Sequence, residues 1–237
     1  MRRAALVLGA LALAGCETTA DKSARLKRAA RHAALAQTGL SISRASTQAK
    51  VLSAVAVRGE EGTAIVVTVR NATKRTLQHV PISVTLKDAS GRILYRNDAP
   101  GLEAGLVSVG SLAPHQTLSW VDDQLPPGAA AGTVDARLGE SASSAASPPR
   151  IRVSEVHPTE DPSAGAGASG TVSNGSATAQ RLLVVYGVGR RAGKIVAAGR
   201  AVVPELAGSS AAHFQLFLLG DASGAKLQLA APATALQ

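Results

Sequence analysis

Short runs of β-branched and aliphatic residues, separated by turn-forming residues, recur through most of this chain. After about residue 50 the runs have the roughly 8 to 12 residue spacing that is typical of sandwiches and barrels. Helix-length amphipathic windows are absent from the same region. The pattern therefore predicts an all-β fold in which sheets pack face to face.

The first group of candidate strands falls within residues 49–140. These runs are rich in valine, isoleucine and threonine, which fit a pleated and half-buried surface. We expect strands over Val51–Val57, Thr63–Arg70, His79–Lys87, Arg92–Tyr95, Leu106–Val109, Gln116–Val121 and Gly132–Leu138. Such a set is sufficient for one β-sandwich domain of immunoglobulin-like or transthyretin-like architecture.

A low-complexity stretch, SASSAASPP, interrupts this pattern at residues 141–149. Serine and alanine cannot build a core, and two prolines stiffen the exit, so we place a linker there. A second β-sandwich domain is expected over residues 150–237, with a flexible loop at Thr159–Ala168. Its expected strands are Arg150–Val156, Gly170–Val172, Arg181–Val188, Lys194–Val203, Ala211–Leu219 and Ala225–Leu229.

The two halves of the β region carry the same short motifs in the same order. Residues 68–73 (TVRNAT) and 171–176 (TVSNGS) each combine the end of a strand with Asn and a small polar turn. A glycine follows the Asn after 20 residues in the first half (Gly91) and 19 in the second (Gly193). Both glycines precede a basic residue and an apolar pair, which predicts hairpin turns that need a positive φ.

The scarce aromatic residues also occupy equivalent places. Only 2% of residues are aromatic, and Trp120 and Phe214 each lie eight residues after the Leu of a Leu-Ala-Pro or Leu-Ala-Gly turn. We expect both rings to fill the ends of cores built mainly from Ala and Val. Asn71 and Asn174 are expected to cap their turns through side-chain hydrogen bonds.

These motifs together are similar to FxLYD-type and related immunoglobulin-like domains of the bacterial envelope. In the first half Val84–Gly91 (VTLKDASG) resembles the F-x-L-Y-D-x-x-G stretch of that family, with Val and Lys where Phe and Tyr are usual. The corresponding stretch of the second half, Tyr186–Gly193, lacks the Asp. The resemblance implies two tandem immunoglobulin-like β-sandwich domains, which follow a signal peptide and a short basic helix.

The N-terminus has the layout of a secretory signal. Arg2 and Arg3 precede an apolar run over Ala4–Ala14, which is too short to cross a bilayer. Leu13–Cys16 (LAGC) resembles the bacterial lipobox, which implies cleavage after residue 15 and acylation of Cys16, for example with palmitate. The protein is then exported and lipid-anchored to the cell membrane or outer membrane. The alternative is ordinary cleavage nearby with a free thiol.

Two neighbouring features bear on this anchor. Cys16 is the only cysteine of the chain, so no intrachain disulfide can form. Glu17 follows it, and the absence of Asp at this position favours outer-membrane sorting in a cell with two membranes.

Residues 16–48 are expected to contain the lipidated cysteine, a basic helix and a linker. Asp21–Gln37 is rich in Ala, Leu, Lys and Arg with helical spacing of its apolar residues. Its five cations and one carboxylate give a net charge of +4. The helix either lies against anionic lipid headgroups or is a solvated spacer.

No catalytic or metal-binding pattern accompanies these features. The five histidines form no H-x-H or H-x-x-x-H pair, and no G-x-S-x-G motif occurs. We expect no enzyme activity, cofactor or metal. An exposed ligand or cation site at Trp120, Asp122 and Asp123 is a weaker alternative to the core role of the Trp, because adjacent Asp residues on a strand point to opposite sides.

Basic residues suggest where a partner could bind. Arg190, Arg191 and Lys194 form a basic hairpin tip that lacks the Ser or Thr of a phosphate loop. These cations either contact an anionic partner or are solvated. Nucleic acid is not expected as a partner of an exported chain with so few aromatic residues.

The sequence thus predicts a membrane-anchored envelope lipoprotein whose two β-sandwich domains form a non-enzymatic binding or scaffold module. The expected partners are membrane lipid, through acylated Cys16, and an envelope protein or anionic polymer. The alternative is an accessory tethering subunit of a secretion, transport or envelope-assembly complex. The sequence leaves the oligomeric state open.

Overall fold

Strands account for nearly all regular structure in the part of the chain that the computed structural model describes, residues 39–126, 132–161 and 165–236. The expected signal peptide, Cys16 and basic helix lie outside these residues. One short helix, α2 (Ala104–Val107), occurs among the described residues. The predicted all-β sandwich fold is therefore confirmed.

The first half contains two main antiparallel sheets and one short strand pair, which is described below. One has the order β1-β2-β7, and in the other β4 lies between β5 and β6 on one side and β8 on the opposite side. The strands of the first sheet are β1 (Ala49–Arg58), β2 (Thr63–Asn71) and β7 (Thr117–Asp122). Those of the second are β4 (Val80–Lys87), β5 (Ile93–Arg96), β6 (Ser108–Val109) and β8 (Thr133–Leu138).

The second half repeats this topology. The order β10-β11-β14 corresponds to β1-β2-β7, and β13-β12-β16 corresponds to β5-β4-β8, with β15 added beside β13. The strands are β10 (Ile151–Asp161), β11 (Gly165–Asn174), β12 (Gln180–Arg191), β13 (Lys194–Leu206), β14 (Ala211–Phe217), β15 (Leu219–Gly220) and β16 (Lys226–Ala230). The repeated sequence motifs thus correspond to a repeated arrangement of strands.

Three sequence-based expectations are wrong in detail. The strand expected over Leu106–Val109 begins as α2, because Leu106 turns inward as a buried residue of that helix. The expected loop Thr159–Ala168 is largely strand, since β10 continues to Asp161 and β11 begins at Gly165. Within the expected linker, Ala142–Ser144 forms β9, which pairs with β3 (Thr76–Gln78). Backbone pairing needs no apolar side chain, so composition alone did not reveal the strands in the expected loop and in the expected linker.

Asn71 closes the turn that follows β2. Its Nδ2 donates to the carbonyl oxygens of Arg75, Leu112 and Ala113 at 2.7, 3.0 and 3.0 Å. Its Oδ1 accepts hydrogen bonds from the backbone N and the Oγ1 of Thr73. The side chain is fully buried and joins the end of β2 to the Leu-Ala turn that precedes β7.

Asn174 repeats these contacts after β11. Its Nδ2 donates to the carbonyl oxygens of Thr178, Ala207 and, at 3.5 Å, Leu206. Its Oδ1 accepts from the backbone N and Oγ of Ser176. The predicted turn-capping role is confirmed at both Asn residues, and each also reaches the distant Leu-Ala turn of its own half.

The glycine and aromatic predictions are confirmed as well. Gly91 and Gly193 have φ values of +83° and +78° in the β4–β5 and β12–β13 turns. Trp120 is fully buried opposite Val67, and Phe214 is 6% exposed opposite Gly170. A Cβ on Gly170 would lie 2.9 Å from Phe214 Cζ, so the glycine makes room for the ring.

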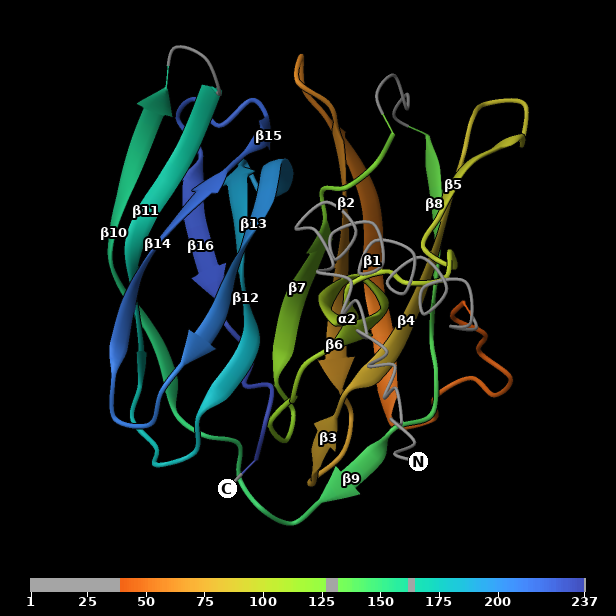
Figure 1. Cartoon of the computed structure of the whole chain (residues 1–237). Coiled ribbons are helices and arrows are strands. Elements are labelled where there is room, and N and C mark those ends of the chain that lie inside the picture. Colours follow the sequence, from red (N-terminus) through yellow and green to blue (C-terminus); the bar gives the residue numbers. More distant parts are fainter. Residues whose placement is uncertain (1–38, 127–131, 162–164, 237) are drawn as a thin grey trace, which may run out of the picture. The chain divides into compact units, whose positions relative to one another are not determined.

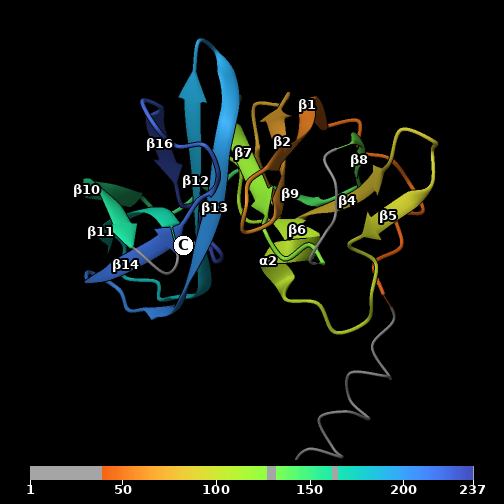
Figure 2. The same ribbon diagram turned by 90° about the horizontal axis from the view of Figure 1, so that it is seen from above.

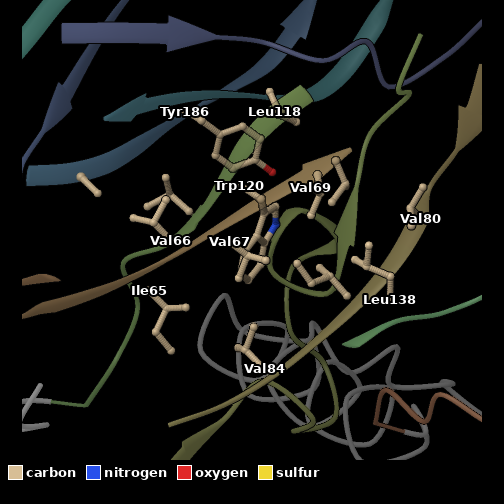
Figure 3. Close-up of a cluster of buried hydrophobic side chains, with 14 of the residues drawn as sticks. Ile65, Val66, Val67, Val69, Val80, Val84, Leu118, Trp120, Leu138 and Tyr186 are labelled. Carbon is tan, nitrogen blue, oxygen red and sulfur yellow. The ribbon is translucent and has the colours of Figure 1, made fainter. Parts of the chain in front are cut away.

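The inner sheets of the two halves pack against each other. The strands form four successive layers, in which β1-β2-β7 and β13-β12-β16 are the inner pair (Figure 1, Figure 2). Val184, Tyr186 and Val188 of β12 belong to the same buried cluster as the β2 and β7 side chains, and Figure 3 shows Tyr186 beside Trp120. The alternate residues Leu183 and Val185 enter the core of the second half.

The central strand of each inner sheet is therefore covered on both faces. Every residue of β2 except Arg70 is buried, and so is every residue from Leu183 to Gly189 of β12. Residues 39–237 group into one compact unit. The division into two domains at residues 141–149 stays a prediction.

We predict that Asn71→Asp destabilises the fold by about 3 kcal/mol or more, because a carboxylate oxygen would replace the donor that faces three carbonyl oxygens. The free energy of unfolding in urea measures this loss. Gln215→Glu is the matched control, since it makes the same amide-to-acid change at an exposed strand position and should cost less than about 0.5 kcal/mol. Equal effects at the two positions would contradict the role given to Asn71.

Candidate functional site

A hollow of about 740 Å³ extends over the outermost sheet of the first half. It crosses β5, β4 and β8 and reaches β1. We call it the β8 groove, and its lining residues are Val51, Ala54, Ser83, Thr85, Lys87, Arg96, Asp98, Val134, Asp135, Ala136 and Arg137.

The alternation of β4 explains why this face is polar. Ile82, Val84 and Leu86 point into the core and are fully buried, so Ser83, Thr85 and Lys87 between them point outward. The same alternation in β8 presents Asp135 and Arg137 on the outer face. The sequence carries this signal as the patterns SVTLK and VDAR, but polar residues on the outer face of a strand are too common to indicate a site.

Charges of both signs alternate across the groove. Thr85 of β4 is paired with Arg96 of β5 on one side and with Asp135 of β8 on the other. One row across the sheet therefore reads Arg, Thr, Asp. Two residues further along the chain on each side, Asp98 follows Arg96 and Arg137 follows Asp135. The acid and the base have therefore exchanged sides in this second row.

The ion pairs of the groove are solvent-accessible. Lys87 Nζ lies 2.6 Å from Asp135 Oδ2, with the side chains 37% and 55% exposed. Arg96 Nη1 lies 4.0 Å from Asp98 Oδ2, and both side chains are about half exposed. The hydrogen bond from Lys87 lowers the pKa of Asp135, which stays ionised. Exposed pairs of this kind contribute little stability and can exchange partners at low cost.

A second polar cluster lies between the halves, where a buried arginine meets two partly buried carboxylates. Arg200 of β13 extends to the first half with a side chain that is 6% exposed. Its Nε lies 3.1 Å from Asp123 Oδ1, its Nη2 lies 3.3 Å from Glu103 Oε2, and its backbone N donates to Asp123 Oδ2. Burial opposes the charge of Arg200, but the two carboxylates outweigh burial and raise the pKa of the guanidinium.

Gly105 permits the close approach of the halves at this point. Its carbonyl oxygen accepts a hydrogen bond from Trp120 Nε1 at 2.8 Å and a longer one from Tyr186 OH at 3.4 Å. A Cβ at this position would lie 2.7 Å from Val184 Cγ2. The cluster therefore serves to join the halves.

The exposed site considered for Trp120, Asp122 and Asp123 is wrong. Trp120 and Asp122 are fully buried, and Asp123 pairs with Arg200. Asp122 Oδ2 accepts a hydrogen bond from Tyr95 OH at 2.7 Å. Burial raises the pKa of Asp122 despite that hydrogen bond, so this carboxyl is an internal partner of Tyr95 rather than a ligand.

The basic hairpin tip is largely engaged within the chain. Arg191 Nη2 lies 2.8 Å from Asp221 Oδ2, and its Nη1 donates to the Ser223 carbonyl. Arg190 Nε donates to Gln228 Oε1, whereas Lys194 is exposed. These contacts engage two of the three cations within the chain, and the choice between an anionic partner and solvated charges stays a prediction.

The histidines form no catalytic arrangement in the part of the chain that the structure describes. Thr171 Oγ1 lies 2.7 Å from Glu155 Oε2 and 3.3 Å from His213 Nδ1, so the Thr stands between the other two residues. A catalytic triad needs the His in that middle position. No group of three or more His, Cys, Asp or Glu side chains that could hold a metal occurs among the described residues.

No described helix has the length and apolar character needed to cross a membrane. The sequence matches no family model, and no curated protein resembles it significantly. The site must therefore be interpreted from its own geometry.

We predict that Arg200→Met destabilises the protein by about 2 kcal/mol or more, because it leaves the partly buried carboxylates of Asp123 and Glu103 without a counter-charge. Arg191→Met is the matched control, since it removes an exposed pair of similar length and should cost at most about 1 kcal/mol. Thermal and urea unfolding of both variants measure the difference. A small loss at Arg200 would show that the cluster does not hold the halves together.

Proposed function

We propose that this chain is a membrane-anchored envelope lipoprotein, and that its β unit is a non-enzymatic binding module. The anchor is acylated Cys16, for which the LAGC sequence and the preceding short apolar run are the support. Two or three acyl chains hold a protein on a membrane where a single chain does not. The mature chain is then exported and held on the cell membrane or the outer membrane.

The β8 groove is the observation that carries the binding role. It is accessible, it faces outward from the outermost sheet, and charged side chains converge on it from three strands. Its ion pairs are weak enough to be replaced by contacts with a partner. By contrast, the other polar cluster centres on a buried arginine and joins the two halves.

The layered packing suits such a role. Four sheets that share buried layers form a stiff support, and binding surfaces on rigid elements are better defined than those on loops. An accessory tethering subunit of a larger envelope complex would use the same surface, with the complex as its partner.

We predict that Cys16→Ala moves the protein from the membrane fraction to the soluble fraction or leaves it as uncleaved precursor. The reason is that alanine has no thiol to acylate. Fractionation followed by measurement of the mature mass checks this. Glu17→Gln is the control, because it changes the neighbouring residue and should leave the protein on the membrane. Retention of a Cys16→Ala protein of mature size would contradict the anchor.

A further inference from the structure

Strand β8 has one free edge, by which we mean an edge that makes no strand-to-strand hydrogen bonds over most of its length among the described residues, although β1 packs close beside it. It pairs with β4 on one side, from Thr133 to Leu138. On the other side the chain pairs only with the end of β8 among the described residues. There the Ser46 N donates to the Leu138 carbonyl at 2.7 Å, and the Glu140 N donates to the Arg44 carbonyl at 3.3 Å.

The chain then leaves this edge. Ser46 Oγ accepts hydrogen bonds from the backbone N of Gln48 and of Ala49, at 3.2 and 2.9 Å. This turn directs the chain into β1, which pairs with β2. The pairing of residues 44–46 with the end of β8 is therefore limited to a single bridge, between Ala45 and Gly139.

Strand alternation identifies the backbone groups that remain unpaired. The N–H of Gly139 points to β4, where it donates to the Pro81 carbonyl, whereas Leu138 and Glu140 point to the free edge. Since successive residues of a strand alternate, Ala136 and Val134 also point their N–H and C=O groups to the free edge. A strand that continued the ladder beyond Ser46 would meet these groups next.

The β8 groove lies along the same edge. Val51, Ala54, Val134 and Ala136 give it a partly buried apolar part, and all four pack against the core of the first half. An added strand would cover these side chains with one face. Its other face would lie beside the outward side chains of β8, Asp135 and Arg137.

The unpaired backbone groups and the mixed charges together favour one class of partner. A polymer with anionic groups alone would be attracted by Lys87, Arg96 and Arg137 but repelled by Asp98 and Asp135, and it has no strand backbone to pair with β8. Charges of opposite sign on an extended peptide, by contrast, can be placed two residues apart on the same face, at about 7 Å from each other. This is the sequence separation of Asp135 from Arg137, which lie on the strand next to the added one. A polypeptide with both acidic and basic side chains fits the groove.

We propose that the β8 groove binds an extended polypeptide segment of another envelope protein, which adds as a strand to the free edge of β8. The segment has small apolar residues on one face and an acid and a base two residues apart on the other. Backbone hydrogen bonds to Val134 and Ala136 supply affinity, and the charged side chains of the groove select the partner. This inference rests on the proposed binding role and is independent of the lipid anchor.

The test uses the purified full-length protein and a synthetic nine-residue peptide of alternating Val and Thr, with one Asp and one Lys two residues apart on the same face. Calorimetry measures its affinity, and hydrogen exchange measures protection of the Ala136 and Val134 amides. We expect binding together with protection of both amides. Methylation of the alternate peptide nitrogens that face β8 should weaken binding by about tenfold or more.

Ala136→Pro should cause a similar loss of affinity, because it removes an N–H that points away from β4 and so leaves the ladder with β4 intact. Ala136→Ser keeps the N–H and should bind normally. The methylated peptide leaves the protein unchanged, so it decides the question even if the proline variant does not fold. Equal affinity for the methylated and unmethylated peptides would overturn strand addition.

Polyphosphate serves as the probe with charges of one sign. If it binds and the peptide does not, the binding role stands and strand addition is wrong. If neither probe binds, strand addition and the binding role given to the groove are both contradicted, whereas the anchor is tested separately by Cys16.

Discussion

The contact between the two inner sheets is the interaction on which the rest of the structure depends. Strands β2 and β12 are buried on both faces, so each contributes side chains to its own sandwich and to the layer between the halves. Burial of apolar surface is the main favourable term in folding, and small side chains allow two such layers to pack closely. The small number of aromatic residues is compatible with this packing, because Val and Ala side chains fill the space between closely packed sheets.

Polar contacts then fix the geometry that the apolar layers leave open. Asn71 holds two turns of the first half together, and Asn174 does the same in the second half. Arg200 joins the halves to each other. A buried ion pair adds little net stability, but removal of one partner is costly, so such a cluster favours one relative placement of the halves. The outermost sheet is thereby held in place, and its groove presents charges in a fixed order.

The sequence predicted the strands, the repeat and the buried rings, because each depends on local patterns such as β-branched runs, Asn turns and glycine hairpins. It did not predict the packing between the halves. The unbroken apolar residues of Ile65–Val67 and Leu183–Tyr186 carry that signal, since a strand exposed on one face alternates. The Arg200 cluster and the β8 groove assemble residues that are far apart in sequence, so no motif could identify them.

Native-state hydrogen exchange with increasing urea tests the shared packing most directly. If the inner sheets form one cooperative layer, the amides of Ile65–Val69 in β2 and Val184–Val188 in β12 exchange through one common opening, with the same free energy and the same urea dependence. Two openings of different free energy, one for each half, would contradict the account.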